Sequence, residues 1–205
     1  MIGVRLGAWT IEEEIGRGGM GTVYRARRTG GDDLAAVKVL AAELAVEPGF
    51  QQRFQREIDI LEKLDHPGIV AFYESGVDRS RYWYAMEYVP GPSFEELRDQ
   101  RGRMSWPEVL EMAWQVAPAL KHAHDHGVIH RDLKPSNLLR MAGPDGKEAV
   151  KLTDFGIASL FASPHLTITG GIIGTPEYLS PEQAAGKPAT KRSDLYSLGI
   201  VLYAL

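Results

Sequence analysis

The chain has 205 residues, 44% of them apolar, so it can bury a substantial core in one domain or in two small lobes. Its 23 Lys and Arg residues against 27 Asp and Glu residues give a net charge of -4, which does not support a nucleic-acid groove or a polybasic membrane surface. The absence of cysteine excludes disulfides, thiolate nucleophiles and zinc–thiolate sites, and it is consistent with a reducing compartment. No apolar run approaches a membrane span, so we expect a cytoplasmic segment without membrane contact.

A glycine-rich stretch follows a partly alternating strand at residues 9–14. It reads I-G-R-G-G-M-G-T-V-Y, and Gly16, Gly18 and Gly21 form a G-x-G-x-x-G pattern that is a weak signal by itself. In a dinucleotide-binding unit the glycines open a helix, whereas here a β-branched and aromatic strand resumes at residues 22–24. We therefore predict a glycine hairpin, whose backbone amides can lie over phosphate groups without Cβ collisions.

Lys38 stands in the middle of an apolar strand expected at residues 34–40. If it points inward it needs an anionic partner, because unpaired burial of a charge costs on the order of several kcal/mol. The alternative is a strand with one solvated face. Glu57 favours the first interpretation, because one turn of a predicted helix can aim its carboxylate at Lys38 and hold the amine towards a phosphate. The helix is predicted by apolar residues at helical spacing: Phe54, Ile58, Leu61 and Leu64.

The segment H-P-G at residues 66–68 is expected to end that helix. Two strands at residues 69–76 and 82–89 follow, joined by a D-R-S-R turn. The sequence P-G-P at residues 90–92 then breaks the pattern. We place a boundary there, between a sheet-rich part and a helix-rich part, which predicts the α+β class.

Two helices are expected next, at residues 94–101 and 106–126. Ser105 and Glu108 form an S-x-x-E capping box at the start of the longer helix. Its expected core face consists of Val109, Leu110, Ala113, Trp114, Ala117 and Leu120. Three histidines, His122, His124 and His126, stand at its end; the helix dipole favours histidine there, and this interpretation outweighs a metal site.

Residues 130–137, H-R-D-L-K-P-S-N, crowd acid, base and amide groups around a proline. Such a loop is either a solvated turn or a chemical site. A strand at residues 149–153 then ends in Asp154-Phe155-Gly156, where the carboxylate is placed either for a cation or for an Asx turn. A strand hairpin can return Asp154 to the neighbourhood of Asn137.

The remaining chain has a polar, glycine-rich segment and a final helix. Residues 159–174 have no clear period and carry several hydroxyls, so we predict a loop. Ser193 and Asp194 start the last helix, which stops at Leu205 with L-G-I-V-L-Y-A-L. We therefore expect the chain to be a fragment whose natural protein continues.

The order of these pieces resembles a Hanks-type Ser/Thr protein kinase of the bacterial, eukaryotic-like branch. The matching motifs are G-R-G-G-M-G-T-V, A-V-K, Glu57, H-R-D-L-K-P-S-N, D-F-G and S-P-E, in order across residues 16–182. The resemblance implies an antiparallel-sheet N-lobe with one main helix at residues 1–89 and a mainly helical, incomplete C-lobe at residues 90–205. It also implies ATP-dependent transfer of the γ-phosphoryl group to Ser and Thr hydroxyls of protein substrates. From the net charge we expect no nucleic-acid partner.

The resemblance assigns nucleotide binding to the first lobe. The glycines would cover the ATP phosphates, Lys38 held by Glu57 would pair with the α and β phosphates, and Met86 would be the gatekeeper before two hinge residues. The full set of nucleotide-binding residues that it implies is Ile15, Gly16, Gly18, Gly21, Val23, Ala36, Lys38, Glu57, Met86, Glu87 and Val89.

The same resemblance assigns the chemistry to the second lobe. Asp132 would orient the substrate hydroxyl and accept its proton, and Lys134 would neutralise charge on the transferred phosphoryl group. Asn137 and Asp154 would hold Mg²⁺ or Mn²⁺. The position of Lys134, two residues after Asp132, is similar to Ser/Thr kinases rather than Tyr kinases, and Thr175 in G-T-P-E-Y agrees.

Arg131 implies regulation. A phosphate on Thr167 or Thr169 would pair with Arg131 and order the loop, so we predict autophosphorylation there, in trans within a kinase dimer if two copies meet.

The chain departs from the family pattern in two ways. S-P-E replaces the common A-P-E, and the usual Arg partner of Glu182 would lie in later helices that this chain lacks. We therefore expect an active parent protein and a weakly active or unstable fragment. One alternative is a nucleotide-binding scaffold that transfers no phosphoryl group, and the presence of Lys38, Asp132, Asn137 and Asp154 argues against it. The other is a small-molecule phosphotransferase, and the long segment after Asp154 argues against that.

Overall fold

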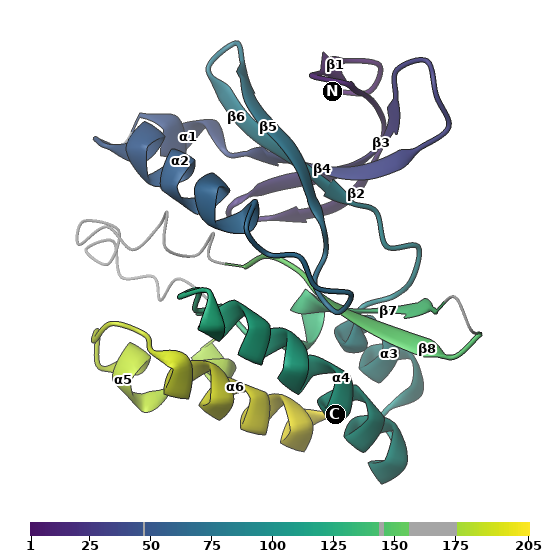
Figure 1. Cartoon of the computed structure of the whole chain (residues 1–205), viewed down its shortest axis with the longest axis vertical. Coiled ribbons are helices and arrows are strands. Elements are labelled where there is room, and N and C mark those ends of the chain that lie inside the picture. Colours follow the sequence, from purple (N-terminus) through teal and green to yellow (C-terminus); the bar gives the residue numbers. More distant parts are fainter. Residues whose placement is uncertain (47, 144–145, 156–175) are drawn as a thin grey trace. The chain divides into compact units, whose positions relative to one another are not determined.

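The computed structural model describes residues 1–46, 48–143, 146–155 and 176–205. Contacts divide the chain into two compact units, Met1–Glu62 with Val70–Val89 and Lys63–Ile69 with Pro90–Leu205. Figure 1 labels their elements. We describe each unit by itself.

The first unit is built on an antiparallel sheet of six strands in the order β1-β2-β3-β4-β6-β5. Two helices follow β4 along the chain, and the longer one lies beside the sheet in Figure 1. The bounds are β1 (Arg5–Leu6), β2 (Trp9–Gly18), β3 (Gly21–Arg28), β4 (Leu34–Leu40), α1 (Ala42–Ala45), α2 (Phe50–Leu61), β5 (Phe72–Asp78) and β6 (Arg81–Glu87). The strand predicted at residues 34–40 is confirmed.

The β5–β6 hairpin forms at the predicted D-R-S-R turn. Arg79 and Ser80 both have positive φ, 47° and 66°, which matches the mirror-image turns that suit the twist of two-residue hairpins. The strands begin and end differently from the prediction, because β5 starts at Phe72 and β6 ends at Glu87.

The main core of this unit lies on one face of the sheet. It is formed by Leu6, Trp9, Ile11, Tyr24, Ala26, Ala35, Val37, Val39, Trp83 and Ala85. Alternate side chains along a strand point to opposite faces, so the residues between these face the other way. That second face is the one that α2 covers, since Phe50 and Phe54 both pack edge-on against Tyr82 with ring centroids 5.0 Å apart.

Helix α2 ends at Leu61, earlier than the predicted end at residues 66–68. Leu64 is buried, as its apolar character predicts, but it belongs to the segment Lys63–Ile69, which packs with the second unit. Apolar spacing predicted burial correctly and could not show that the chain leaves the helix first.

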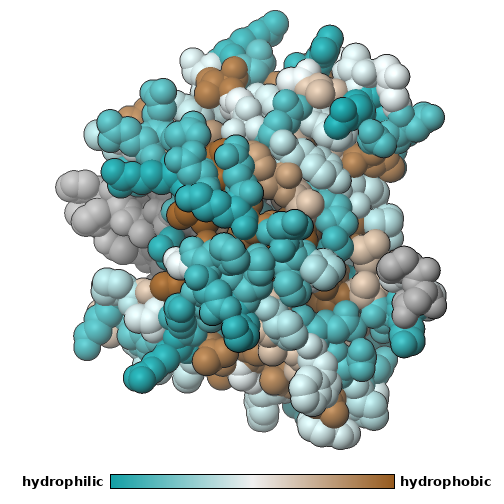
Figure 2. All heavy atoms as spheres, in the orientation of Figure 1, coloured by the Kyte–Doolittle hydropathy of each residue, from teal (hydrophilic) through white to brown (hydrophobic). Residues whose placement is uncertain are grey.

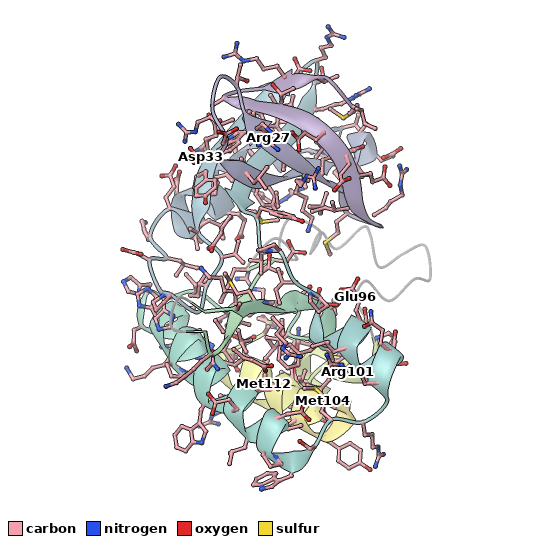
Figure 3. All side chains as sticks on the ribbon, turned by 90° about the vertical axis from the view of Figure 1, so that its right-hand side faces the viewer. Arg27, Asp33, Glu96, Arg101, Met104 and Met112 are labelled. Atoms are coloured by element: carbon pink, nitrogen blue, oxygen red, sulfur yellow. The ribbon has the colours of Figure 1, made fainter. Side chains whose placement is uncertain are left out.

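The second unit combines helices with a two-stranded antiparallel sheet. Its elements are α3 (Phe94–Arg101), α4 (Trp106–Asp125), the 3-10 turn η1 (Pro135–Asn137), β7 (Leu138–Ala142), β8 (Glu148–Leu152), the 3-10 turn η3 (Pro176–Tyr178), α5 (Pro181–Ala184) and α6 (Lys191–Ala204). Helix α3 has the predicted bounds. It also has a capping box that the sequence analysis does not predict, between Ser93 and Glu96 at the first turn of the helix. Glu96 is labelled in Figure 3. The predicted capping box of Ser105 and Glu108 is confirmed.

The predicted core face of α4 is wrong in part. Trp114 is 69% exposed and Leu110 is also exposed, whereas Met112 is 1% exposed and lies inside the unit (Figure 3). The buried residues are Val109, Met112, Val116, Ala119, Leu120, Ala123 and His124. Apolar residues occur on more than one side of this helix, so the spacing fits two faces and does not choose between them.

Helix α4 also closes one edge of the small sheet. Gln115 Oε1 accepts from the Val150 N–H (2.9 Å), and Gln115 Nε2 donates to the Glu148 carbonyl (3.0 Å). One amide side chain thus replaces a neighbouring strand along β8. This pairing fixes β8 against α4.

Hydrophilic side chains cover much of the face drawn in Figure 2, with hydrophobic residues scattered between them. Among the described helices, none is both long and apolar enough to cross a membrane.

Candidate active-site residues

The glycine hairpin predicted from the sequence is present between β2 and β3. Gly18 pairs with Gly21, and Gly16 pairs with Val23. Gly21 has φ 143°, and a Cβ there would collide with the Val39 carbonyl oxygen, so this position requires glycine for the fold itself. A Cβ at Gly16 or Gly18 would meet no heavy atom within 4 Å. Packing of the unit therefore does not explain these two glycines, whereas close approach of a ligand to the backbone would.

Four of the predicted nucleotide-binding residues share one face of the sheet. Lys38, 6% exposed, lies opposite Val23 across the β3–β4 pair, and Ala36 lies opposite Met86 across the β4–β6 pair. Residues opposite each other across a ladder, and residues two apart along a strand, point to the same side. The four side chains therefore gather on the face away from the main core.

The same face is the one covered by α2. Glu57 lies on this helix three residues after Phe54, on the side that Phe54 turns towards Tyr82, and it is half-buried. The predicted partner of Lys38 is thus carried by the helix that packs on the Lys38 side of the sheet.

The remaining predicted nucleotide-binding residues lie at irregular points of the strands. Ile15 is the extra residue of a bulge, since Glu14 and Gly16 pair with consecutive residues of β3. Glu87 ends β6: its N–H donates to the Ala71 carbonyl (2.8 Å), and its carboxylate accepts from the Ala71 N–H (3.2 Å). Val89 follows two residues later and is buried.

In the second unit, the loop at residues 130–137 brings its charged groups together. Lys134 Nζ lies 2.8 Å from Asp132 Oδ2, and both side chains are largely but not fully buried. Asn137 Nδ2 donates to the Asp132 carbonyl oxygen (2.7 Å) and lies 3.5 Å from Asp132 Oδ2. The Asp132 carboxylate is therefore held beside a cation and an amide.

The β7–β8 hairpin brings Asp154 to the same end of the sheet as Asn137. Leu138 pairs with Leu152, and the Thr153 N–H donates to the Asn137 carbonyl (3.0 Å). Asp154 follows directly and has φ 61°, a left-handed conformation that is uncommon for a residue other than glycine. Such strained backbone often occurs at functional positions.

The two residues fit a magnesium ion by their donor chemistry. Because the Asn137 amide nitrogen is engaged by the Asp132 carbonyl, its Oδ1 is the acceptor that remains for a cation. Asp154 adds a carboxylate. Magnesium needs only one or two protein oxygens when phosphate oxygens supply the rest.

Asp194, at the first turn of α6, is a site residue that the sequence analysis missed. It is 1% exposed, and its two carboxylate oxygens accept from the backbone N–H groups of His130 (2.8 Å) and Arg131 (2.9 Å). His124 Nε2 lies 2.7 Å from Asp194 Oδ2. The sequence alone places Asp194 only at the start of the last helix. The available signal was an acidic residue directly before the mostly apolar stretch at residues 195–205, because a carboxylate that becomes buried requires donors.

Arg131 lies between two fixed hydrogen bonds. Its N–H donates to Asp194, its carbonyl accepts from Gln183 Nε2 (2.8 Å), and its φ is 69°. Thr167 and Thr169, which we predicted to be phosphorylated near Arg131, lie outside the described residues.

His130 is fully buried and hydrogen-bonded inside the second unit. It is 0% exposed, its Nε2 lies 3.0 Å from the Thr153 carbonyl, and its ring lies 4.6 Å from the Phe155 ring. Burial lowers the pKa of His130, so the imidazole is neutral and Nε2 donates to the carbonyl. The other histidines show no metal site: within the described ranges, no group of three or more His, Asp or Glu side chains could hold a metal ion.

Comparisons with known proteins give the family. The model of the protein kinase domain matches residues 9–205. The chain is 44% identical over 197 residues to serine/threonine-protein kinase PknJ of Mycobacterium tuberculosis, covering 96% of this chain and 33% of the relative. It is 41% identical over 206 residues to serine/threonine-protein kinase PrkC of Bacillus subtilis, covering 100% of this chain and 31% of the relative. The chain thus spans about a third of the length of these curated relatives.

Solved structures of similar proteins are also kinase domains. The kinase domain of Mycobacterium tuberculosis PknI is 31% identical, with a TM-score of 0.78 over 98% of this chain and 75% of that domain. The predicted α+β class and kinase-like fold are confirmed. The chain belongs to the protein kinase family, with relatives among the bacterial Ser/Thr kinases.

Proposed function

We propose that the protein transfers the γ-phosphoryl group of ATP to Ser and Thr hydroxyls of protein substrates. The observation that carries the proposal is the cluster of Asp132, Lys134 and Asn137 in one loop, with the Asp132 carboxylate held 2.8 Å from the Lys134 amine. Family membership and the names of the relatives support the same reaction class.

In the first unit, the proposal gives the glycine hairpin and Lys38 the binding of phosphates. The open space around Gly16 and Gly18 supports close approach of phosphate oxygens to backbone amides. Lys38, buried on the same face as Val23 and Ala36, would place its amine at the phosphates. The apolar side chains of Val23 and Ala36 would pack against the adenine ring. Glu57 would orient Lys38, while the backbone of Glu87 and Val89 would bind the adenine edge.

In the second unit, a carboxylate oxygen of Asp132 would orient the substrate hydroxyl and accept its proton. The Lys134 amine would stabilise negative charge on the transferred group. Asn137 Oδ1 and the Asp154 carboxylate would hold magnesium, which neutralises charge on the ATP phosphates when bound. The role of Asp194 is to position the loop, because it binds the backbone just before Asp132 and touches no reacting atom.

The experiment uses the whole natural protein that carries this chain, with γ-labelled ATP, magnesium and a mixture of protein substrates. The proposal expects acid-stable label on phosphoserine and phosphothreonine, lost on adding a chelator. Label confined to phosphotyrosine or to small molecules, or no magnesium-dependent label at all, would contradict it.

We further propose that autophosphorylation of Thr167 or Thr169 regulates the enzyme through Arg131. The support is that the backbone of Arg131 is held at its N–H by Asp194 and at its carbonyl by Gln183. The side chain therefore starts from a fixed position in the backbone. A phosphate can form charge-assisted hydrogen bonds with such a guanidinium.

Phosphopeptide mapping after incubation with ATP tests this regulation. We expect phosphate on Thr167 or Thr169, an initial rate that rises with the square of enzyme concentration if a dimer phosphorylates in trans, and loss of the resulting activation in Arg131→Gln. Unmodified threonines, or full activation of the Arg131→Gln variant, would contradict it. The cytoplasmic location stays a prediction.

A further inference from the structure

Three histidines of the second unit form a cluster outside the catalytic loop. His66 lies in the segment Lys63–Ile69, and His122 and His126 lie at the end of α4. The ring centroids of His66 and His122 are 5.2 Å apart, and those of His122 and His126 are 4.3 Å apart. Within the described residues, the buried Nε2 of His122 has no hydrogen-bond partner. The reaction proposed above uses none of these side chains.

The hydrogen bonds of the cluster fix which nitrogens carry protons. His66 Nδ1 accepts from the Gly68 N–H (3.0 Å), so the neutral ring of His66 carries its proton on Nε2. His126 Nδ1 lies 2.8 Å from the His122 carbonyl and therefore donates to it. A protonated His66 has N–H on both nitrogens and cannot accept from Gly68. Protonation of His66 must therefore break this bond.

Gly68 connects the cluster to β8. Its carbonyl accepts from the Leu152 N–H (2.9 Å), and Ile69 forms a parallel bridge with the same Leu152. A Cβ at Gly68 would lie 3.2 Å from the Cβ of Ala119 on α4, so the segment fits closely against this helix. Leu152 is the last residue of β8, two positions before Asp154.

The groups around His66 determine at which pH its ring is protonated. Burial and the neighbouring His122 lower the pKa of His66, while Asp65 beside it opposes this shift. On α4, Lys121 and Asp125 pair with each other at 2.6 Å, and His124 pairs with Asp194. Hence His66 is neutral at pH 7 and becomes protonated only in more acidic solution.

We propose that His66 is a pH-sensitive latch, whose protonation releases Gly68 and loosens the end of β8 that leads to Asp154. Acidification then weakens the segment that holds this strand in place. The loosening is independent of the enzyme's function. Only its consequence for phosphoryl transfer rests on the proposed role of Asp154.

Nuclear magnetic resonance of the wild-type chain tests the latch directly. The His66 ring and the Gly68 amide are followed together from pH 7.5 to pH 5. The proposal expects both to titrate with the same midpoint. A Gly68 amide that does not respond while the ring titrates, or a His66 ring that stays neutral until the chain unfolds, overturns it.

A matched pair of variants gives a second test. His66→Asn supplies an oxygen that can accept from the Gly68 N–H in an Asx turn and does not titrate, whereas His126→Gln removes another histidine of the cluster and keeps a donor for the His122 carbonyl. The measurement is hydrogen-exchange protection of the Leu152 amide, corrected for intrinsic exchange. We expect this protection to fall about fivefold or more between pH 7.5 and pH 5.5 in wild type and in His126→Gln. In His66→Asn we expect it to stay constant.

An equal loss of protection in wild type and His66→Asn would contradict the latch. Phosphoryl transfer is measured on the same samples, in the whole natural protein. A pH-dependent Leu152 amide without any transfer activity refutes the proposed function and leaves the latch intact, so the two failures are distinguishable.

Discussion

A buried carboxylate, Asp194, holds the backbone of the loop at residues 130–137. Its two oxygens bind the N–H groups of His130 and Arg131, two consecutive residues, and this arrangement accompanies the left-handed conformation of Arg131. His124 Nε2 also lies 2.7 Å from the Asp194 carboxylate. The loop conformation thus depends on a side chain that is 64 residues away from His130 in sequence.

Asp194→Asn tests this dependence. An asparagine of the same shape can accept with only one oxygen and turns an N–H group towards a backbone donor, so we expect the free energy of unfolding to fall by about 3 kcal/mol. Urea denaturation measures it. The control is Asp125→Asn, which removes an exposed carboxylate that pairs with Lys121. A loss no larger than that of the control would contradict the role of Asp194.

The two kinds of glycine in the hairpin give a second prediction at this scale. Gly21→Ala combines a positive φ with a collision at Val39, so it should destabilise the chain by about 2 kcal/mol or more. Gly18→Ala has open space and should keep wild-type stability while weakening ATP binding. Thermal unfolding and titration with magnesium-ATP separate the two effects. Equal destabilisation by both substitutions would show that space at Gly18 is not reserved for a ligand.

At the scale of elements, α4 shows how far apolar spacing can be trusted. The local sequence predicted the extent of the helix and its capping box, because both depend on neighbouring residues along the chain. The apolar spacing did not predict which side of α4 faces inward, because that depends on where β8 and α6 pack against this helix. Trp114 and Met112 are both apolar, and only their neighbours in space distinguish them.

The two residues make a matched test. Met112→Ala should lower the free energy of unfolding by about 2 to 4 kcal/mol, because it leaves a cavity in a closed core. Trp114→Ala removes a larger side chain from a solvated position and should change stability far less. Denaturant titration of both variants measures the difference. A larger loss for Trp114→Ala would mean that the predicted face was right after all.

The candidate site was predictable to different degrees in the two units. The pairing Gly18 with Gly21, and the return of Asp154 to Asn137, follow from strands and turns that local sequence specifies. The positioning role of Asp194 and the packing of the segment Lys63–Ile69 with the second unit were not predicted. Both depend on contacts between residues distant in sequence, for which periodicity contains no information.

At the scale of the whole molecule, stability should depend on pH through two histidines, the partly buried His66 and the buried His130. Burial lowers the pKa of His66 and His130, so the folded chain binds fewer protons than the unfolded chain near the ordinary value of 6.5. Their contribution is therefore complete above that value and is lost as pH falls below it. Differential scanning calorimetry should show a lower unfolding temperature at pH 5.5 than at pH 7.5. His66→Asn should reduce this difference, and an unchanged difference would contradict the contribution of His66.

The proposed phosphoryl transfer depends most on Asp132. We compare transfer of labelled phosphate by wild-type protein and by Asp132→Asn, each within the whole natural protein and with magnesium-ATP binding measured in parallel. Removing the carboxylate that we propose as the proton acceptor should lower transfer by a factor of about 100 or more, while ATP binding stays near wild type. Transfer that survives Asp132→Asn at near wild-type rate would contradict the assignment of the reaction to this loop.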